Sequence, residues 1–195
     1  MLARSYLAQL TTALNRDFGN ALNAAYITGS AVVGAYRPGR SDLDVLVAVD
    51  VVERSTLDRV VATCSHEALP CPATKLELVV YEATALASPG SRPRWSLNFD
   101  TGIGVHHVGL DPDAEPAHWF VLDLAFARRH AQPLLGPPPA TLIGEISDDA
   151  IEHALEQMVR WYELNEPAGV EVARERARHW KLTGNFTPKP GLPSP

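Results

Sequence analysis

Two aspartates separated by one residue stand at the start of an apolar stretch, "SDLDVLVAV". Side chains alternate between the two faces of a strand, so Asp42 and Asp44 project from the same face and repel each other. A divalent cation between two such carboxylates removes the repulsion, and Mg²⁺ prefers a few carboxylate oxygens together with substrate phosphates. The spacing therefore predicts a magnesium site that acts on a phosphate-bearing substrate.

A glycine, a serine and a third acid accompany this pair. Gly29-Ser30 follows the short apolar run "AAYI", where the missing side chain lets a phosphate approach the backbone and the Ser30 hydroxyl can donate a hydrogen bond. Glu77 in "KLELVVYE" projects from the face opposite its neighbouring leucines, and it joins the two aspartates if its strand pairs with theirs. Each feature alone is commonly a turn, a cap or a solvated acid, whereas their combination favours metal-dependent phosphate chemistry.

The hydrophobic periodicity around these residues predicts the elements that position them. Apolar residues recur at helical spacing in some segments and alternate or run together in others, with Gly and Pro between them. We expect a helical turn after Gly29, helices over 2–18, 53–69, 117–130, 147–164 and 170–182, and strands over 24–27, 42–49 and 75–82. Residues 83–116 show no clear pattern. The sequence predicts an α+β fold, with a mixed sheet flanked by helices in residues 1–115 and a small helical domain in residues 116–195.

Charge and cysteine content limit the class of protein. The 195 residues carry a net charge of −6 without a Lys/Arg-rich run, which argues against binding of nucleic acid through phosphate contacts. Cys64 and Cys71 do not have the spacing of a disulfide framework or a zinc site, which fits a reducing compartment. No apolar run has the pattern of a signal peptide or a membrane span. We therefore expect a cytoplasmic protein that binds neither nucleic acid nor membrane, with a monomer favoured.

The segment "ITGSAVVGAYRPGRSDLDVLV" resembles the signature of the nucleotidyltransferase superfamily, in which a hydrophobic strand, Gly-Ser and a loop precede Asp-x-Asp. The strand "LELVVY" matches the one that carries the superfamily's third acid. Within the superfamily, the chain most resembles aminoglycoside 3''/9-adenylyltransferases of the streptomycin/spectinomycin type. Its segments "WFVLDLAFARRHAQPLLGPPP" and "ARHWKLTGNFTPKP" are similar to that group's helical C-terminal domain. The chain ends before those relatives do, so we expect a shortened, incomplete helical domain.

This resemblance implies a role for each residue of the motif. Gly29 and Ser30 hold the triphosphate of ATP, Asp42 and Asp44 bind two Mg²⁺ ions, and Glu77 is the catalytic base. The implied reaction is the Mg²⁺-dependent transfer of AMP from ATP to a hydroxyl of a small cationic acceptor such as an aminoglycoside, with release of pyrophosphate. The chemistry is consistent, because nucleotidyl transfer needs an in-line hydroxyl, a proton acceptor and cations that neutralise phosphoryl charge.

The resemblance also implies two nucleotide contacts from the C-terminal part. Arg178 in "ARHW" and Lys189 in "TPKP" match the family's basic residues at these positions, although a solvated helix face and tail explain both equally well. The segment "LNFDTGIGVHH" lacks the tryptophan of streptomycin-modifying relatives, which argues against streptomycin as the acceptor. Two alternatives stay open, since fold does not fix substrate. One is the same fold acting on a protein or another metabolite, as in antitoxin-type relatives, and the other is a catalytically weak nucleotide-binding domain.

Overall fold

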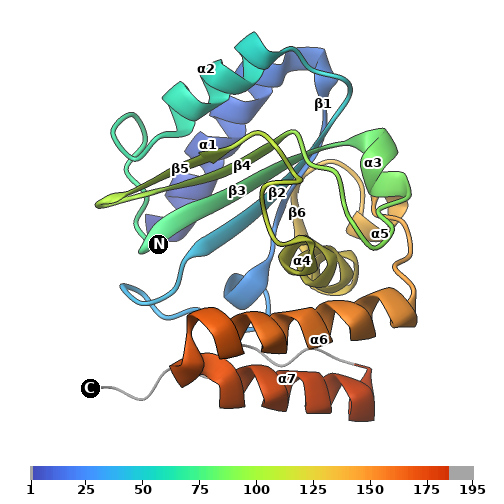
Figure 1. The fold of residues 1–195 in the computed structure, drawn as a ribbon. Coiled ribbons are helices and arrows are strands. Elements are labelled where there is room, and N and C mark those ends of the chain that lie inside the picture. The colour runs from blue at the N-terminus through green and yellow to red at the C-terminus, as the bar shows by residue number, and fades with distance from the viewer. Residues whose placement is uncertain (1, 185–195) are drawn as a thin grey trace.

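The computed structural model describes residues 2–184 and contains a six-stranded mixed sheet with helices on both faces (Figure 1). The strands are β1 (Leu22–Ile27), β2 (Leu43–Val49), β3 (Lys75–Glu82), β4 (Leu97–Gly102), β5 (Val105–Gly109) and β6 (Gln132–Leu135). The α-helices are α1 (Leu2–Phe18), α2 (Arg54–Cys64), α3 (Ala83–Ala87), α4 (Ala117–His130), α5 (Pro139–Leu142), α6 (Asp148–Asn165) and α7 (Val170–Thr183). Short 3-10 helices lie at Gly19–Ala21, Gly29–Ala31 and Pro167–Gly169. The expected α+β class is confirmed.

The sheet brings together strands that lie far apart in the sequence. Its order is β5-β4-β3-β2-β1-β6, in which β2 and β3 are parallel and connected through α2, and the other neighbours are antiparallel. The register pairs Asp44 of β2 with Glu77 of β3. The strand of the third acid therefore does pair with the strand of the two aspartates.

Alternation along β2 sends its side chains into two separate hydrophobic cores. Val45 and Val47 are buried in the core under α1 and α2, whereas Leu46 and Ala48 are buried in the core under α4, α6 and α7. Figure 1 shows these two sets of helices on opposite sides of the sheet. Asp44 shares a face with Leu46, so it projects toward α4, α6 and α7.

The C-terminal helices cover this second face of the sheet. Helix α4 lies next to the sheet, α6 packs against α4, and α7 packs against α6 (Figure 1). Their apolar faces bury Phe120, Leu124, Met158 and Trp180, which supplies the hydrophobic stabilisation expected of amphipathic helices. Within residues 2–184, no helix is both long enough and apolar enough to cross a membrane.

The structure also contains elements that the periodicity does not predict. Residues 83–116 hold α3, β4 and β5, and the helical turn after Gly29 is a single 3-10 turn, Gly29–Ala31. Strand β6, from the region expected to be purely helical, forms an edge of the sheet beside β1. It is only four residues long and contains Pro133, which an edge strand tolerates because it leaves one side unpaired. The boundary at residue 115 remains a prediction.

Candidate active site

A cavity of about 520 Å³ lies between the exposed ends of β2, β3 and β4 and the helices α4, α6 and α7. Among residues 2–184 it is strongly acidic, because seven acidic side chains line it, against two basic ones. The acids are Asp42, Asp44, Glu77, Asp100, Glu115, Asp123 and Glu166, and the bases are Lys75 and Arg176. A cavity with this charge attracts cations and the cationic parts of ligands.

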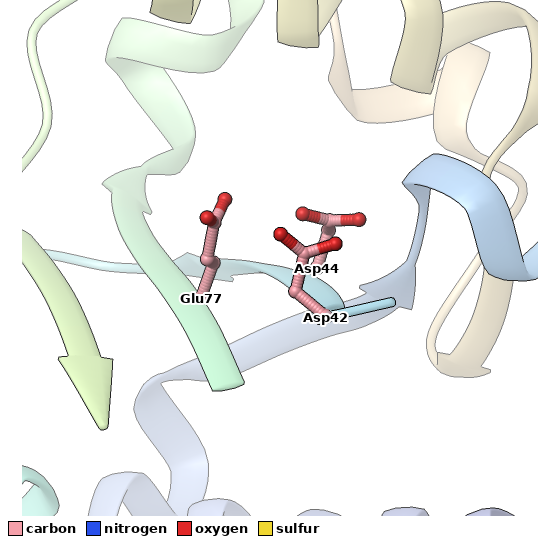
Figure 2. Close-up of side chains that lie close together, drawn as sticks. All are labelled: Asp42, Asp44 and Glu77. Atoms are coloured by element: carbon pink, nitrogen blue, oxygen red, sulfur yellow. The ribbon is translucent and has the colours of Figure 1, made fainter. Parts of the chain in front are cut away.

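The three carboxyl groups expected to act together do converge at one wall of this cavity. Asp42 stands directly before β2, Asp44 lies within it, and Glu77 lies opposite Asp44 on β3. Figure 2 shows their carboxyl groups projecting to the same side of the two strands. One oxygen of each lies within 4.8 Å of the others, which is close enough for two or three of them to hold one cation.

The electrostatics of this cluster fit a divalent cation. Enclosure by protein atoms, followed by the negative charges of Asp42, Glu77 and Asp123, raises the pKa of Asp44 well above its usual value. A raised pKa means that the ionised carboxylate is held at a free-energy cost. A bound cation offsets this cost, and hard oxygen ligands of this kind select Mg²⁺ or a similar ion rather than zinc.

The absence of a side chain at Gly29 makes room for the carboxylate of Asp44. Its φ is +62°, in the left-handed region that favours glycine, and a Cβ at this position would lie 1.8 Å from Oδ2 of Asp44. The buried hydroxyls of Thr28 and Ser30 on either side make no hydrogen bond within residues 2–184. Buried hydroxyls are normally hydrogen-bonded, so these two are suited to an oxygen-rich ligand at the cavity wall. Gly29 and Ser30 both line the cavity, and their contact with phosphate stays a prediction.

A lysine that the sequence analysis did not single out contacts the third acid. Lys75 Nζ lies 2.5 Å from Oε1 of Glu77 and donates a hydrogen bond of 3.0 Å to Oδ2 of Asp100 on β4. The two carboxylates raise the pKa of Lys75 against the opposing effect of burial, which keeps the ammonium charged. The spacing of Lys75 from Glu77 could have identified it from the sequence, because residues 75 and 77 of one strand project from the same face.

A second group of side chains is centred on Glu115, at the cavity wall formed by β4 and the loop before α4. Glu115 accepts a hydrogen bond of 2.7 Å from Asn98 Nδ2, and its other oxygen lies 3.1 Å from Nε2 of His107. These contacts fix the Glu115 carboxylate, whose side chain is 21% exposed, at the cavity. The sequence did not predict this group, because β4 and β5 were not recognised.

The helices contribute aromatic side chains and one buried arginine. Trp119 of α4 packs edge-to-face against Trp161 and Tyr162 of α6, at ring-centroid distances of 5.4 and 5.9 Å. Arg176 of α7 lines the cavity, and its Nε has no hydrogen-bond partner within the described residues. Burial lowers the pKa of Arg176, while the charge of Asp123 opposes that shift. The guanidinium therefore has donor capacity available to a ligand.

The two basic residues inferred from the resemblance have different outcomes. Arg178 does not line the cavity: its side chain is 68% exposed and lies 3.9 Å from the carboxylate of Glu171 on the same helix. Arg176, two residues earlier, lies on the cavity side instead. Lys189 falls outside residues 2–184, so its predicted contact with the nucleotide stays a prediction.

Comparison with known proteins supports the fold. No family model and no curated protein matches the sequence. Among solved structures, spectinomycin adenyltransferase AAD(9) from Enterococcus faecialis, determined with ATP and spectinomycin, is similar with a TM-score of 0.71. The two chains are 17% identical over 96% of this chain and 79% of that one. A toxin-antitoxin structure with AMP-PNP aligns at a TM-score of only 0.36, with 11% identity over 86% of this chain and 96% of that one.

The match at 17% identity shows a shared fold. The fold implied by the resemblance, a mixed sheet flanked by helices with a helical C-terminal part, is thereby confirmed. What this chain transfers, and to which acceptor, depends on its own residues.

Proposed function

We propose that this protein is a Mg²⁺-dependent nucleotidyltransferase that transfers AMP from ATP to a hydroxyl group of a small cationic acceptor such as an aminoglycoside. The observation that carries the proposal is the convergence of Asp42, Asp44 and Glu77 within 4.8 Å beside Gly29, in a cavity large enough for a nucleotide. The adenyltransferase with the same fold was solved with ATP and spectinomycin, which supports the choice of substrates.

The reaction assigns a step to each of these residues. The acceptor hydroxyl oxygen attacks the α-phosphorus of ATP, the bond from this phosphorus to the oxygen bridging to the β-phosphorus breaks, and pyrophosphate leaves with the electron pair. The hydroxyl proton passes to the carboxylate of Glu77, a general-base contribution of roughly 10²–10⁴-fold. Asp42 and Asp44 would hold two Mg²⁺ ions, which supply the positive charge that phosphoryl transfer requires.

The nucleotide binds, in this proposal, between the β1 end and α7. Gly29 allows the phosphates to approach the backbone, and the hydroxyls of Thr28 and Ser30 donate hydrogen bonds to phosphate oxygens. Arg176 donates hydrogen bonds to the nucleotide from the opposite wall of the cavity, which is the role that the resemblance suggested for Arg178.

The remaining acids make the cavity suitable for a cationic acceptor. Glu115 is oriented by hydrogen bonds, and Asp123 and Glu166 lie on the helical side of the same cavity. Ammonium groups bind carboxylates and aromatic faces, and Trp119 and Trp161 provide such faces. We propose the cytoplasm as the compartment, because it supplies ATP and because Cys64 and Cys71 are both free thiols.

The test is mass spectrometry of spectinomycin and a panel of aminoglycosides after incubation with the protein, ATP and Mg²⁺. An AMP adduct that is absent with Asp42→Asn and Glu77→Gln, but present with Asp58→Asn, supports the proposal. Asp58 is the matched control because it is an exposed aspartate that pairs with Arg54 on α2, away from the cavity. If no drug is modified although the protein binds Mg²⁺ and ATP, a protein or another metabolite is the acceptor. If ATP does not bind, the proposal is wrong.

A further inference from the structure

Lys75 occupies a central position among the acids of the cavity. Register pairs Asp44 with Glu77 and Glu77 with Asp100, so three carboxylates from three neighbouring strands form one row on the same face of the sheet. Neighbouring strands are about 4.8 Å apart, and like charges at directly opposite positions destabilise a sheet. Lys75 projects from the same face of β3 and places its ammonium between Glu77 and Asp100.

Lys75 therefore neutralises one end of this row. The ammonium of Lys75 lies against Glu77 and Asp100, whereas Glu77 also lies within 4.8 Å of Asp42 and Asp44. A cation held by the two aspartates attracts the carboxylate of Glu77 as a third ligand. A carboxylate that coordinates a metal ion is a weaker proton acceptor, because the ion's charge withdraws electron density from its oxygens. Glu77 can act as the base only if it is kept out of the ligand set.

We propose that Lys75 is a positioning residue that holds Glu77 outside the set of metal ligands, so that Asp42 and Asp44 bind the ion and Glu77 is reserved for the proton. This inference rests on the proposed function, since it assumes a divalent ion at the two aspartates. The contact of 2.5 Å to Glu77 and the hydrogen bond of 3.0 Å to Asp100 hold the ammonium from two sides. Gly102 lies opposite Lys75 on β4, where the absence of a side chain leaves room for the lysine.

Metal binding tests this role without an activity assay. We would titrate the full chain with Mn²⁺, in the absence of nucleotide, and measure free Mn²⁺ by electron paramagnetic resonance. Lys75→Met removes the ammonium and keeps the length of the side chain, so Glu77 becomes available as a third ligand. We expect Mn²⁺ to bind on the order of ten-fold more tightly, the size of effect that residues supporting metal ligands commonly produce. Lys75→Arg retains the positive charge and should keep the wild-type affinity.

A second background separates positioning from a simple charge effect. Removing any positive charge from the cavity strengthens cation binding, whatever the position of Glu77. The same Lys75→Met change is therefore made in a Glu77→Gln protein, in which no third carboxylate can be released. Only the general charge effect remains there, so the inference expects a clearly smaller increase of affinity than in the wild-type background. Lys181→Met is the matched control, because Lys181 is a half-exposed lysine of α7 that lies 3.9 Å from Glu156 and outside the cavity.

Each outcome decides the matter. Equal tightening in the wild-type and Glu77→Gln backgrounds, or no tightening in either, overturns the positioning role of Lys75 and leaves the proposed metal site intact. If the wild-type chain binds no Mn²⁺ alone, the same titrations are made with ATP present, because such ions are held partly by substrate phosphates. Failure to bind Mn²⁺ there as well, or binding that survives Asp44→Asn, refutes the proposed function itself. Circular dichroism shows whether each variant folds, and Lys75→Gln replaces Lys75→Met if the methionine variant does not.

Discussion

Replacing Asp44 by asparagine should stabilise the protein in the absence of metal ions while abolishing its use of them. Asp44 lies within 4.8 Å of both Asp42 and Glu77. At an effective dielectric constant of about 20, each ionised pair at that distance repels by at least about 3.5 kcal/mol. Burial and these neighbouring charges raise the pKa of Asp44, so its ionised form is held at a free-energy cost in the folded protein. We therefore expect a net gain of about 2 kcal/mol, within the range of a single stabilising substitution.

The pH dependence of this gain follows from the direction of the pKa shift. The folded protein binds the proton of Asp44 more tightly than the unfolded chain, whose pKa is near 3.8. Wild-type stability is therefore lost as pH rises above that value, and Asp44→Asn removes this loss. For a chain of this length, about 2 kcal/mol corresponds to an increase in Tm of roughly 4–8 °C at pH 7.5.

The assay is thermal unfolding with EDTA or with Mg²⁺ and ATP, for wild type, Asp44→Asn and the exposed control Asp58→Asn. Mg²⁺ and ATP should raise the Tm of the wild type and of the control, but not that of Asp44→Asn, because only bound ligand stabilises the folded state. A Tm of Asp44→Asn that is unchanged or lower at pH 7.5 in EDTA would refute the reasoning. So would a gain of equal size at pH 3.5, where Asp44 is largely protonated in both folded and unfolded states.

Two other predictions concern the site, and a third concerns the buried His118 of α4. Glu77→Gln should lower kcat by roughly 10²–10⁴-fold, the usual worth of a general base, and leave the KM for ATP nearly unchanged. Arg176→Met should raise the KM for ATP by roughly 10–100-fold, the equivalent of one charge-assisted hydrogen bond, whereas Arg178→Met should not, since Arg178 is 68% exposed outside the cavity. Burial lowers the pKa of His118 to about 4, so chemical denaturation should show about 3 kcal/mol of stability lost as pH falls from 6.5 to 4, and His118→Phe should remove this loss.

A different result would contradict each of these three predictions. A large change in the KM for ATP with unchanged kcat would assign Glu77 to nucleotide binding rather than to proton transfer. If Arg176→Met and Arg178→Met changed the KM for ATP equally, the location of Arg176 in the cavity would not explain its effect. For His118, the folded state resists protonation and the unfolded state, with a pKa near 6.5, does not. A stability that is flat between pH 6.5 and 4, after subtraction of the His118→Phe profile, would contradict the stated cause.

The amino-acid sequence was sufficient to predict the residues of the motif and the elements that carry them. Strand alternation in "SDLDVLVAV" placed Asp42 and Asp44 on one face of an apolar strand, and in "KLELVVYE" it placed Glu77 on the face opposite its neighbouring leucines. Helix periodicity predicted α4 over residues 117–130 and α1 over residues 2–18, with the bounds that the structure has. These patterns are local, because each reflects only which face of a single strand or helix carries the apolar residues.

Contacts between strands and helices were decided only by the tertiary structure. A local pattern contains neither the register between strands nor the rotation of a helix about its axis. These decide which acid Lys75 contacts, which side chain hydrogen-bonds to Glu115, and that Arg178 is exposed. Strands β4, β5 and β6 were missed because their short, partly polar sequences become strands through pairing with neighbours rather than through their own periodicity.

By itself, the sequence determined which functional groups this chain offers: paired aspartates, a third acid and a glycine turn. The folded chain decided how that chemistry is arranged, because pairing of β2, β3 and β4 brings distant carboxylates into one row beside Lys75. Packing of α4, α6 and α7 over that row then creates the acidic cavity and selects Arg176 as the arginine that faces it. The physical reason is that the residue type fixes which functional group is present. The pKa of that group and its contacts with a ligand depend on burial and on distances to other side chains, and these arise only when helices and strands pack together.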